Sequence, residues 1–287
     1  MSPLFSCVMP VKGPRPYMEE ALASLRNQRM GDDLEIIIQD GSGELFECSD
    51  CSIDRLKNEG VNIRWEREPD RGQSDALNKG FAKAKGEWLF WLNADDVLLP
   101  GALKKVKEKV SGFKFQVSGG KGIDWIAGNM MHIDAEGKVI DCRRDRGWKS
   151  AYRNQQVQVY GPSSFFRRDL FEECGGFDTS LRVCMDVDMW MKFREHDHWY
   201  YKLPRYVWGF REHAGSLTRS ACRDADELKN QWREISEMQK RHGISPTFLD
   251  CLRARLLRLI SGSYLIGAFD TLRYRGKDYR GLYGGLS

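Results

Sequence analysis

Short apolar runs alternate with helix-like segments over the first third of the chain. Runs rich in β-branched and aromatic residues predict strands, and apolar positions three and four residues apart predict helices. The predicted strands are Leu4–Met9, Leu34–Ile38, Val61–Trp65 and Trp88–Leu92, and the predicted helices are Tyr17–Gln28, Ile53–Asn58 and Ser74–Lys85. This alternation favours an α/β fold with a Rossmann-like, mostly parallel sheet flanked by helices.

The pattern changes after the fourth strand. A hairpin is expected where Asp124–Ile133 and Lys138–Cys142 flank a polar turn. The other elements expected are helices at Leu103–Val110, Asp169–Cys174, Val187–His196 and Asp226–Arg241, and strands at Ser163–Arg167, Trp199–Leu203 and Val207–Phe210. A basic amphipathic helix is expected from Thr247, with apolar positions at Phe248, Leu249, Leu252, Leu256, Leu259 and Ile260.

Composition fits a soluble globular protein, with 41% hydrophobic and 30% charged residues among 287. No apolar run reaches the roughly 18 residues that a transmembrane helix needs, and the N-terminus does not resemble a secretory signal. The expected location is therefore the cytoplasm, with peripheral attachment to the inner face of the cell membrane left open.

The positive charge is concentrated at the C-terminus. From Cys251 onward seven basic residues face two acidic ones, a balance of +5 where the whole chain carries +4. Two alternatives follow for the final helix: it lies on an anionic membrane surface, or it packs on the rest of the protein with its basic face in water. Nucleic-acid binding is not expected, because the remainder of the chain is close to neutral.

Polar segments follow all four predicted N-terminal strands: Pro10–Gly13, Gln39–Ser42, Glu68–Asp75 and Asn93–Asp96. Parallel strands place their carboxyl ends at one edge of a sheet, so these segments are expected to be neighbours. The last follows the apolar run Trp88–Leu92, where two adjacent carboxylates suit Mg²⁺ or Mn²⁺. Taken alone, Asp95 and Asp96 fit a solvated turn equally well.

Later segments add candidates of lower specificity. Asp186 and Asp188 near a helix start cannot share a face, so one is free to point into a site while the other caps the helix. His213 is a candidate metal ligand or phosphate donor. The pair His196 and His198 diverges on a helix and is not expected to bind metal.

Taken together, these segments resemble the family 2 glycosyltransferases of the GT-A fold. The resemblance covers roughly residues 3–220 and rests on five motifs in the family's order: Glu68–Gly80, Glu87–Asp96, Gly161–Arg168, Cys174–Asp178 and Met185–Trp190. It implies a GT-A domain over residues 1–220, with a nucleotide-sugar-binding half at 1–110 and an acceptor half at 111–220. Residues 221–287 are then a helical, basic extension.

The resemblance also implies roles for matched residues. Asp96 would be the principal ligand of Mn²⁺ or Mg²⁺, with Asp95 beside it, and His213 is added to this metal set. Asp186 would be the catalytic base. Donor binding would involve Pro10, Asp40, Asp70, Arg71, Asn78, Asp95 and Arg211. The chain departs from the family pattern at four positions, which are Lys12, Gln39, Asn93 and Met185.

The function expected is metal-dependent, inverting transfer of a hexosyl or N-acetylhexosaminyl group in polysaccharide biosynthesis. The donor would be a nucleotide sugar, UDP-linked by expectation, and the acceptor a hydroxyl of a glycan or lipid-linked molecule. Two alternatives stay open: a nucleotidyltransferase, and a non-catalytic protein that binds nucleotide sugars or glycans. The sugar, the linkage and the oligomeric state are not predictable from these motifs.

Overall fold

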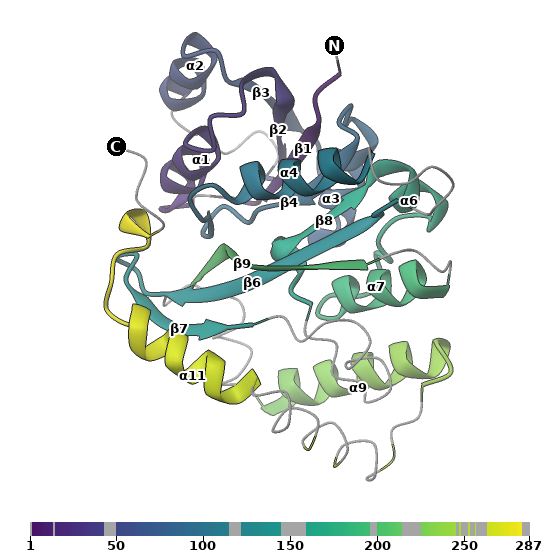
Figure 1. The fold of residues 1–287 in the computed structure, drawn as a ribbon. Coiled ribbons are helices and arrows are strands. Elements are labelled where there is room, and N and C mark those ends of the chain that lie inside the picture. The colour runs from purple at the N-terminus through teal and green to yellow at the C-terminus, as the bar shows by residue number, and fades with distance from the viewer. Residues whose placement is uncertain are drawn as a thin grey trace.

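The structure, a computed structural model, describes residues 2–13, 15–42, 50–114, 122–144, 159–195, 200–213, 225–244 and 263–282, with Thr247, Leu252 and Leu256. Within these residues nine strands form one mixed sheet, in the order β3-β2-β1-β4-β8-β6-β9-β5, and β7 pairs with β6 outside this order. Helices cover the sheet on its two faces (Figure 1).

The N-terminal half confirms the predicted alternation of strands and helices. Its elements are β1 (Phe5–Val11), α1 (Met18–Arg26), β2 (Leu34–Asp40), α2 (Asp50–Asn58), β3 (Asn62–Arg67), α3 (Gln73–Ala82) and β4 (Trp88–Trp91). β1 pairs in parallel with both β2 and β4, and β2 pairs in parallel with β3. The carboxyl ends of these strands therefore meet at one edge, as expected.

The second half joins the sheet through antiparallel and parallel pairs. Its elements are β5 (Val97–Leu98), α4 (Ala102–Lys114), β6 (Trp125–Ile133), β7 (Val139–Arg143), β8 (Ser164–Arg167), α6 (Arg168–Glu173), α7 (Met185–Glu195) and β9 (Tyr200–Arg211). β6 and β7 form the predicted hairpin. The two strands predicted around Pro204 are one strand, β9, whose register with β6 shifts near Ala127 and Asn129.

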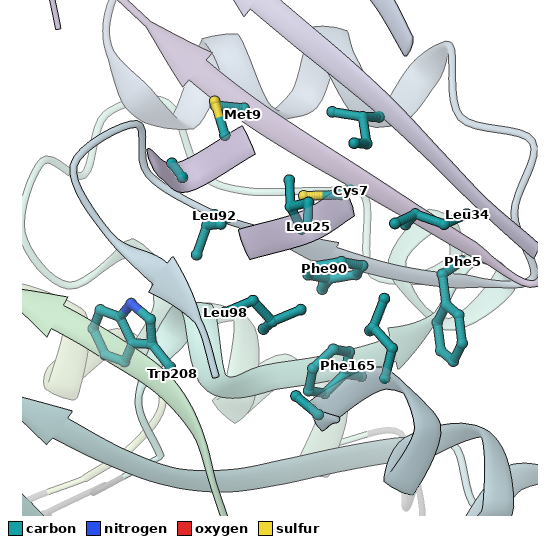
Figure 2. Close-up of a cluster of buried hydrophobic side chains, with 14 of the residues drawn as sticks. Phe5, Cys7, Met9, Leu25, Leu34, Phe90, Leu92, Leu98, Phe165 and Trp208 are labelled. Carbon is teal, nitrogen blue, oxygen red and sulfur yellow. The ribbon is translucent and has the colours of Figure 1, made fainter. Parts of the chain in front are cut away.

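Alternation along β1 separates two apolar cores. Phe5, Cys7 and Met9 point to one face, where they pack with Phe90 of β4 and Leu25 of α1 (Figure 2). The opposite face carries Val8, and α3, α6 and α7 cover it. On that face Trp190 of α7 stacks between Trp91 of β4 and Trp125 of β6. These contacts fix α7 beside β4 and β6.

The C-terminal elements pack on the sheet domain. They are α9 (Ala225–Arg241), α11 (Ser263–Tyr274) and a 3-10 turn at Tyr279–Gly281. Met238 of α9 is buried with the α7 core, while Tyr279 and Leu282 complete a third cluster against β6 and β7. No helix in the described part of the chain is both long and apolar enough to cross a bilayer. The helix predicted from Thr247 lies largely outside the described residues, as do His196 and His198.

Candidate active site

A cavity of about 630 Å³ opens at the edge of the sheet where the parallel strands end. The segments after β1 and β4, the entry to α3, and the loop before α7 form its wall. Its lining residues are Pro10, Val11, Lys12, Arg15, Asp70, Arg71, Gly72, Gln73, Ser74, Asp75, Ala76, Asn93, Ala94, Asp95, Thr179, Leu181, Arg182 and Phe210. Three of the four predicted polar segments thus contribute to one cavity, in the crevice where open α/β sheets place their ligands.

Asp95 reaches the cavity, and its side chain meets the end of β9. The Oδ2 atom of Asp95 lies 3.2 Å from Nε2 of His213. The ring of Tyr17 lies 5.0 Å from that imidazole and limits its movement. The sequence separates Asp95 and His213 by more than a hundred residues, and the pairing of β5 with β9 brings their segments together.

Asp96 points the other way and is only 1% exposed. The backbone amide of Arg211 donates to its Oδ1 at 2.9 Å, and the side-chain amide of Asn93 donates to its Oδ2 at 2.9 Å. Burial, together with the neighbouring charge of Asp95, raises the pKa of Asp96 well above its ordinary range. The two adjacent acids therefore occupy different environments, one at the cavity and one inside the protein.

Asn93 links Asp96 to the cavity wall. Its side-chain oxygen accepts a hydrogen bond of 2.8 Å from Gln73, while its nitrogen donates to Asp96. An aspartate in this place could not donate to Asp96 while ionised. The departure of Asn93 from the family pattern is thus compatible with a buried Asp96.

Arg211 is fully buried and does not line the cavity. Its guanidinium donates to the carbonyl oxygens of Asp95, Asp134 and Ala135 and forms an ion pair of 2.8 Å with Glu20. These contacts hold the Asp95 segment in place from the protein interior. A direct contact between Arg211 and the donor stays a prediction.

Asp40, the last residue of β2, and Asp70, in the loop after β3, have different surroundings. Asp40 is buried, and the Ser42 amide and the Trp65 indole donate to its carboxylate. Asp70 lines the cavity with Pro10, and its Oδ1 accepts from the amide of Gly72 at 2.9 Å. A Cβ atom on Gly41 would lie 1.7 Å from Oδ2 of Asp70, so any larger residue at position 41 would displace the Asp70 side chain.

Basic side chains enter the cavity from several directions. Arg71 lies at its mouth, 76% exposed, within 3.5 Å of Asp75. Lys12, Arg15 and Arg182 also line it, and none of these three forms an ion pair with a described residue. Lys12 belongs to the polar segment Pro10–Gly13, which was expected at this edge of the sheet, whereas Arg15 and Arg182 were not predicted as site residues. Such a cluster suits a polyanion such as a diphosphate.

Asn78 ties α3 to the loop before α7 and is not part of the cavity wall. It donates to the Phe177 carbonyl at 2.8 Å and accepts from the Phe177 amide at 2.9 Å. This two-way contact holds the loop that carries Thr179, Leu181 and Arg182 beside α3. The predicted donor contact of Asn78 stays a prediction.

Asp186 lies in the first turn of α7, beside Gly161. A Cβ atom on Gly161 would lie 3.1 Å from Oδ2 of Asp186. That Cβ atom would also clash with the ring of Trp91. Burial raises the pKa of Asp186 from 3.8 to about 6, although backbone N–H groups that include those of Val187 and Gly161 oppose the rise. Asp186 is half-buried and is not among the residues lining the cavity. A carboxyl group with this pKa is poised to accept a proton near neutral pH.

Asp188 forms ion pairs inside the protein. One of the two acids was expected to have such a structural role. The Asp188 carboxylate lies 2.9 Å from Nε2 of His242 and 3.0 Å from Nζ of Lys192. It is 3% exposed and is not among the residues that line the cavity. Asp188 therefore joins α7 to the end of α9.

Asp95 and His213 are side chains beside the cavity that suit a divalent cation. Carboxylate oxygen and imidazole nitrogen are ligands that Mn²⁺ accepts, and Asp95 and His213 offer one of each. No group of three or more His, Cys, Asp or Glu side chains among the described residues is arranged to hold a metal. The pair fits a cation whose remaining ligands come from water and from substrate phosphates, as is usual for Mg²⁺ sites.

Comparison with known proteins finds relatives by sequence. The model of the family described as glycosyl transferase family 2 matches residues 6–175. An uncharacterized glycosyltransferase of Rickettsia prowazekii is 26% identical over 235 residues, which cover 80% of this chain and 71% of the relative. A PGL/p-HBAD biosynthesis glycosyltransferase of Mycobacterium tuberculosis is 27% identical over 191 residues, 65% of this chain and 68% of that protein.

Solved structures share the fold at low sequence identity. TarS 1-349 of S. aureus in complex with UDP-GlcNAc superposes with a TM-score of 0.60 at 16% identity, over 83% of this chain and 66% of that one. The mannosyltransferase PcManGT of Pyrobaculum calidifontis, in complex with GDP-Man and Mn²⁺, superposes with a TM-score of 0.53 at 16% identity. The match covers 98% of this chain and 83% of that one. The expected GT-A fold is confirmed by these similarities.

Proposed function

The chain belongs to glycosyl transferase family 2 and is a glycosyltransferase, and from this premise we propose that it transfers a hexosyl or N-acetylhexosaminyl group with inversion. The donor is a nucleoside diphosphate sugar, and the acceptor is a hydroxyl group. The observation that carries the proposal is the cavity at the strand ends, where Asp95 pairs with His213 beside a cluster of basic side chains.

Asp186 acts as the general base in this proposal. Its carboxylate takes the proton from the acceptor hydroxyl while that oxygen forms a bond to the anomeric carbon. The bond from the anomeric carbon to the diphosphate breaks on the opposite side, and the nucleoside diphosphate leaves. Asp188, the other acid in this turn, is held by Lys192 and His242, so Asp186 is the better candidate for proton transfer.

The donor diphosphate binds between the basic side chains and Asp95. Lys12, Arg15 and Arg182 attract its negative charge, while Asp95 and His213 are the proposed protein ligands of the metal. When bound, Mn²⁺ or Mg²⁺ stabilises the negative charge that develops on the leaving diphosphate. We place Asp95 ahead of Asp96 as ligand, because Asp96 is buried and engaged by Asn93 and by the Arg211 amide.

A donor screen tests the reaction. Purified protein is incubated with UDP- and GDP-linked sugars and Mn²⁺, and release of the nucleoside diphosphate is measured with and without candidate acceptors. Wild-type protein should release it, and Asp186→Asn should lower turnover by about 10²-fold or more. Glu172→Gln, at an exposed acid of α6, is the matched control and should keep full activity. Near-wild-type turnover by Asp186→Asn would remove the base assignment, and pyrophosphate release from a nucleoside triphosphate would indicate a nucleotidyltransferase instead.

Metal binding is tested separately by titrating Mn²⁺ into the protein with UDP present. Asp95→Asn and His213→Ala should each weaken Mn²⁺ binding by about tenfold or more, since each removes one of two protein ligands. Asp96→Asn should leave Mn²⁺ binding largely intact. The opposite ranking, with Asp96→Asn the most damaging, would restore Asp96 as the principal ligand.

A further inference from the structure

Helix α11 has its polar side turned toward the protein and its apolar side turned outward. Positions that recur at helical spacing, Gly267, Asp270, Thr271 and Tyr274, face β7 and its neighbours. Large apolar residues occupy the opposite arc, and their exposed fractions are 76% at Leu265, 41% at Ile266, 64% at Phe269 and 80% at Leu272. A surface helix ordinarily shows the reverse arrangement, with its apolar stripe toward the core.

The inner side of α11 is held by specific polar contacts. Asp270 is 7% exposed, pairs with Arg144 at 2.8 Å and accepts a hydrogen bond from the Tyr206 hydroxyl. The hydroxyl of Thr271 accepts from the Cys142 amide at 3.0 Å. These contacts fix the rotation of the helix, so the apolar arc cannot turn inward without leaving Asp270 unpaired in the core.

Basic residues border the apolar arc. Arg273 lies four residues after Phe269 on the same side of the helix, and Arg275 and Lys277 follow it. All three are exposed, and none forms an ion pair with a described residue. The two nearby acids are already engaged, Asp270 with Arg144 and Asp278 with Arg280. The border of the apolar arc is therefore positive.

We propose that the outer face of α11, formed by Leu265, Ile266, Phe269 and Leu272 with Arg273, Arg275 and Lys277, docks on an anionic membrane surface. The apolar side chains enter the boundary between headgroups and acyl chains, and the basic side chains contact lipid phosphates. A symmetric contact between two copies fits less well, because it would bring the basic residues of both copies together. The helix lies along β7 at the rim of the molecule, where such a surface can reach it (Figure 1).

Vesicle co-sedimentation of the full chain tests this proposal. Wild-type protein should sediment with vesicles of phosphatidylcholine mixed with phosphatidylglycerol, much less with phosphatidylcholine alone, and less at high salt. The variant Leu265→Ser/Phe269→Ser/Leu272→Ser should reduce binding to the mixed vesicles by about tenfold or more. Arg273→Gln/Arg275→Gln/Lys277→Gln should remove the preference for anionic vesicles.

The control is Trp232→Ser, which removes a 68% exposed apolar side chain from α9, and it should bind vesicles as the wild type does. Circular dichroism checks the fold of each variant, and the single change Leu272→Asp serves if the triple variant misfolds. Equal vesicle binding by wild type and by the α11 variants would overturn the proposal. So would a wild-type dimer, seen by light scattering, that fails to bind vesicles and dissociates in the α11 variants, because the face would then be an interface between copies.

Discussion

Adjacent residues of one motif have different environments in this protein. The sequence places Asp95 and Asp96 together at the end of β4, and it predicts correctly that the strand stops there. It does not show which carboxylate faces the cavity, because that depends on Arg211 and His213, which are more than a hundred residues away. The position of the two carboxylates after β4 was therefore predictable, but which of them faces the cavity was not.

The pH dependence of stability should reveal the environment of Asp186. Folding raises the pKa of this carboxyl from 3.8 to about 6, so the folded protein binds the proton more tightly than the unfolded chain. Its contribution is then most favourable below pH 4 and is lost as the pH rises through 6. At pH values above 6, the ionised carboxylate lowers the unfolding free energy by up to about 3 kcal/mol.

Replacing Asp186 by Asn should therefore stabilise the protein at pH 8 and change little at pH 4. Urea unfolding of both proteins at the two pH values measures this difference. In the same pH range, wild-type turnover should rise as the pH increases through about 6, because the base must be deprotonated. If Asp186→Asn is less stable than the wild type at pH 8, the ionised carboxylate of Asp186 stabilises the folded protein, which contradicts this prediction.

At the scale of elements, α9 holds the start of α7. The carboxylate of Glu234 accepts hydrogen bonds from the backbone amides of Arg182, Val183 and Cys184, at 2.7 to 3.1 Å. A side chain from another helix thus holds the three residues that directly precede α7, in the manner of a cap. Arg182 lines the cavity and Asp186 follows one turn later, so this cap positions both.

Replacing Glu234 by Ala should lower the unfolding free energy by about 1–2 kcal/mol, on the scale of a lost helix cap. Turnover should fall as well, since the loop before α7 loses its anchor. Glu237→Ala, at an exposed position of the same helix, is the matched control and should change neither quantity. Denaturant unfolding and steady-state kinetics measure the two effects. Equal behaviour of both variants would mean that α7 keeps its start without this cap.

Helix and strand positions were largely predictable, because each follows from a local pattern of apolar residues. The predicted β6–β7 hairpin and the N-terminal alternation are confirmed. The long-range contacts were not predictable. Nothing in the spacing of Glu234 or Asn78 indicates a partner near residues 177–184, since such contacts arise only when α3, α7 and α9 pack together.

At the scale of the whole molecule, the carboxylate of Glu20 connects the C-terminal segment with Arg211, which lies behind the cavity. Glu20 of α1 forms an ion pair with Arg211 and contacts the Tyr279 hydroxyl and the Arg280 guanidinium. Arg211 in turn donates to the Asp95 carbonyl. Segments from the beginning, middle and end of the chain therefore meet behind the proposed metal ligand.

Glu20→Ala should destabilise the protein by about 3–5 kcal/mol, because it leaves the fully buried Arg211 without its carboxylate partner. It should also weaken Mn²⁺ binding, since the Asp95 segment loses support from Arg211. Glu20→Gln keeps the size and the hydrogen-bonding oxygen and should recover part of both losses, and Glu19→Ala, at the adjacent exposed position, is the control. Thermal unfolding and Mn²⁺ titration measure the two effects. If Glu20→Ala loses stability but binds Mn²⁺ as tightly as the wild type, the contact holds the C-terminal segment in place without positioning Asp95.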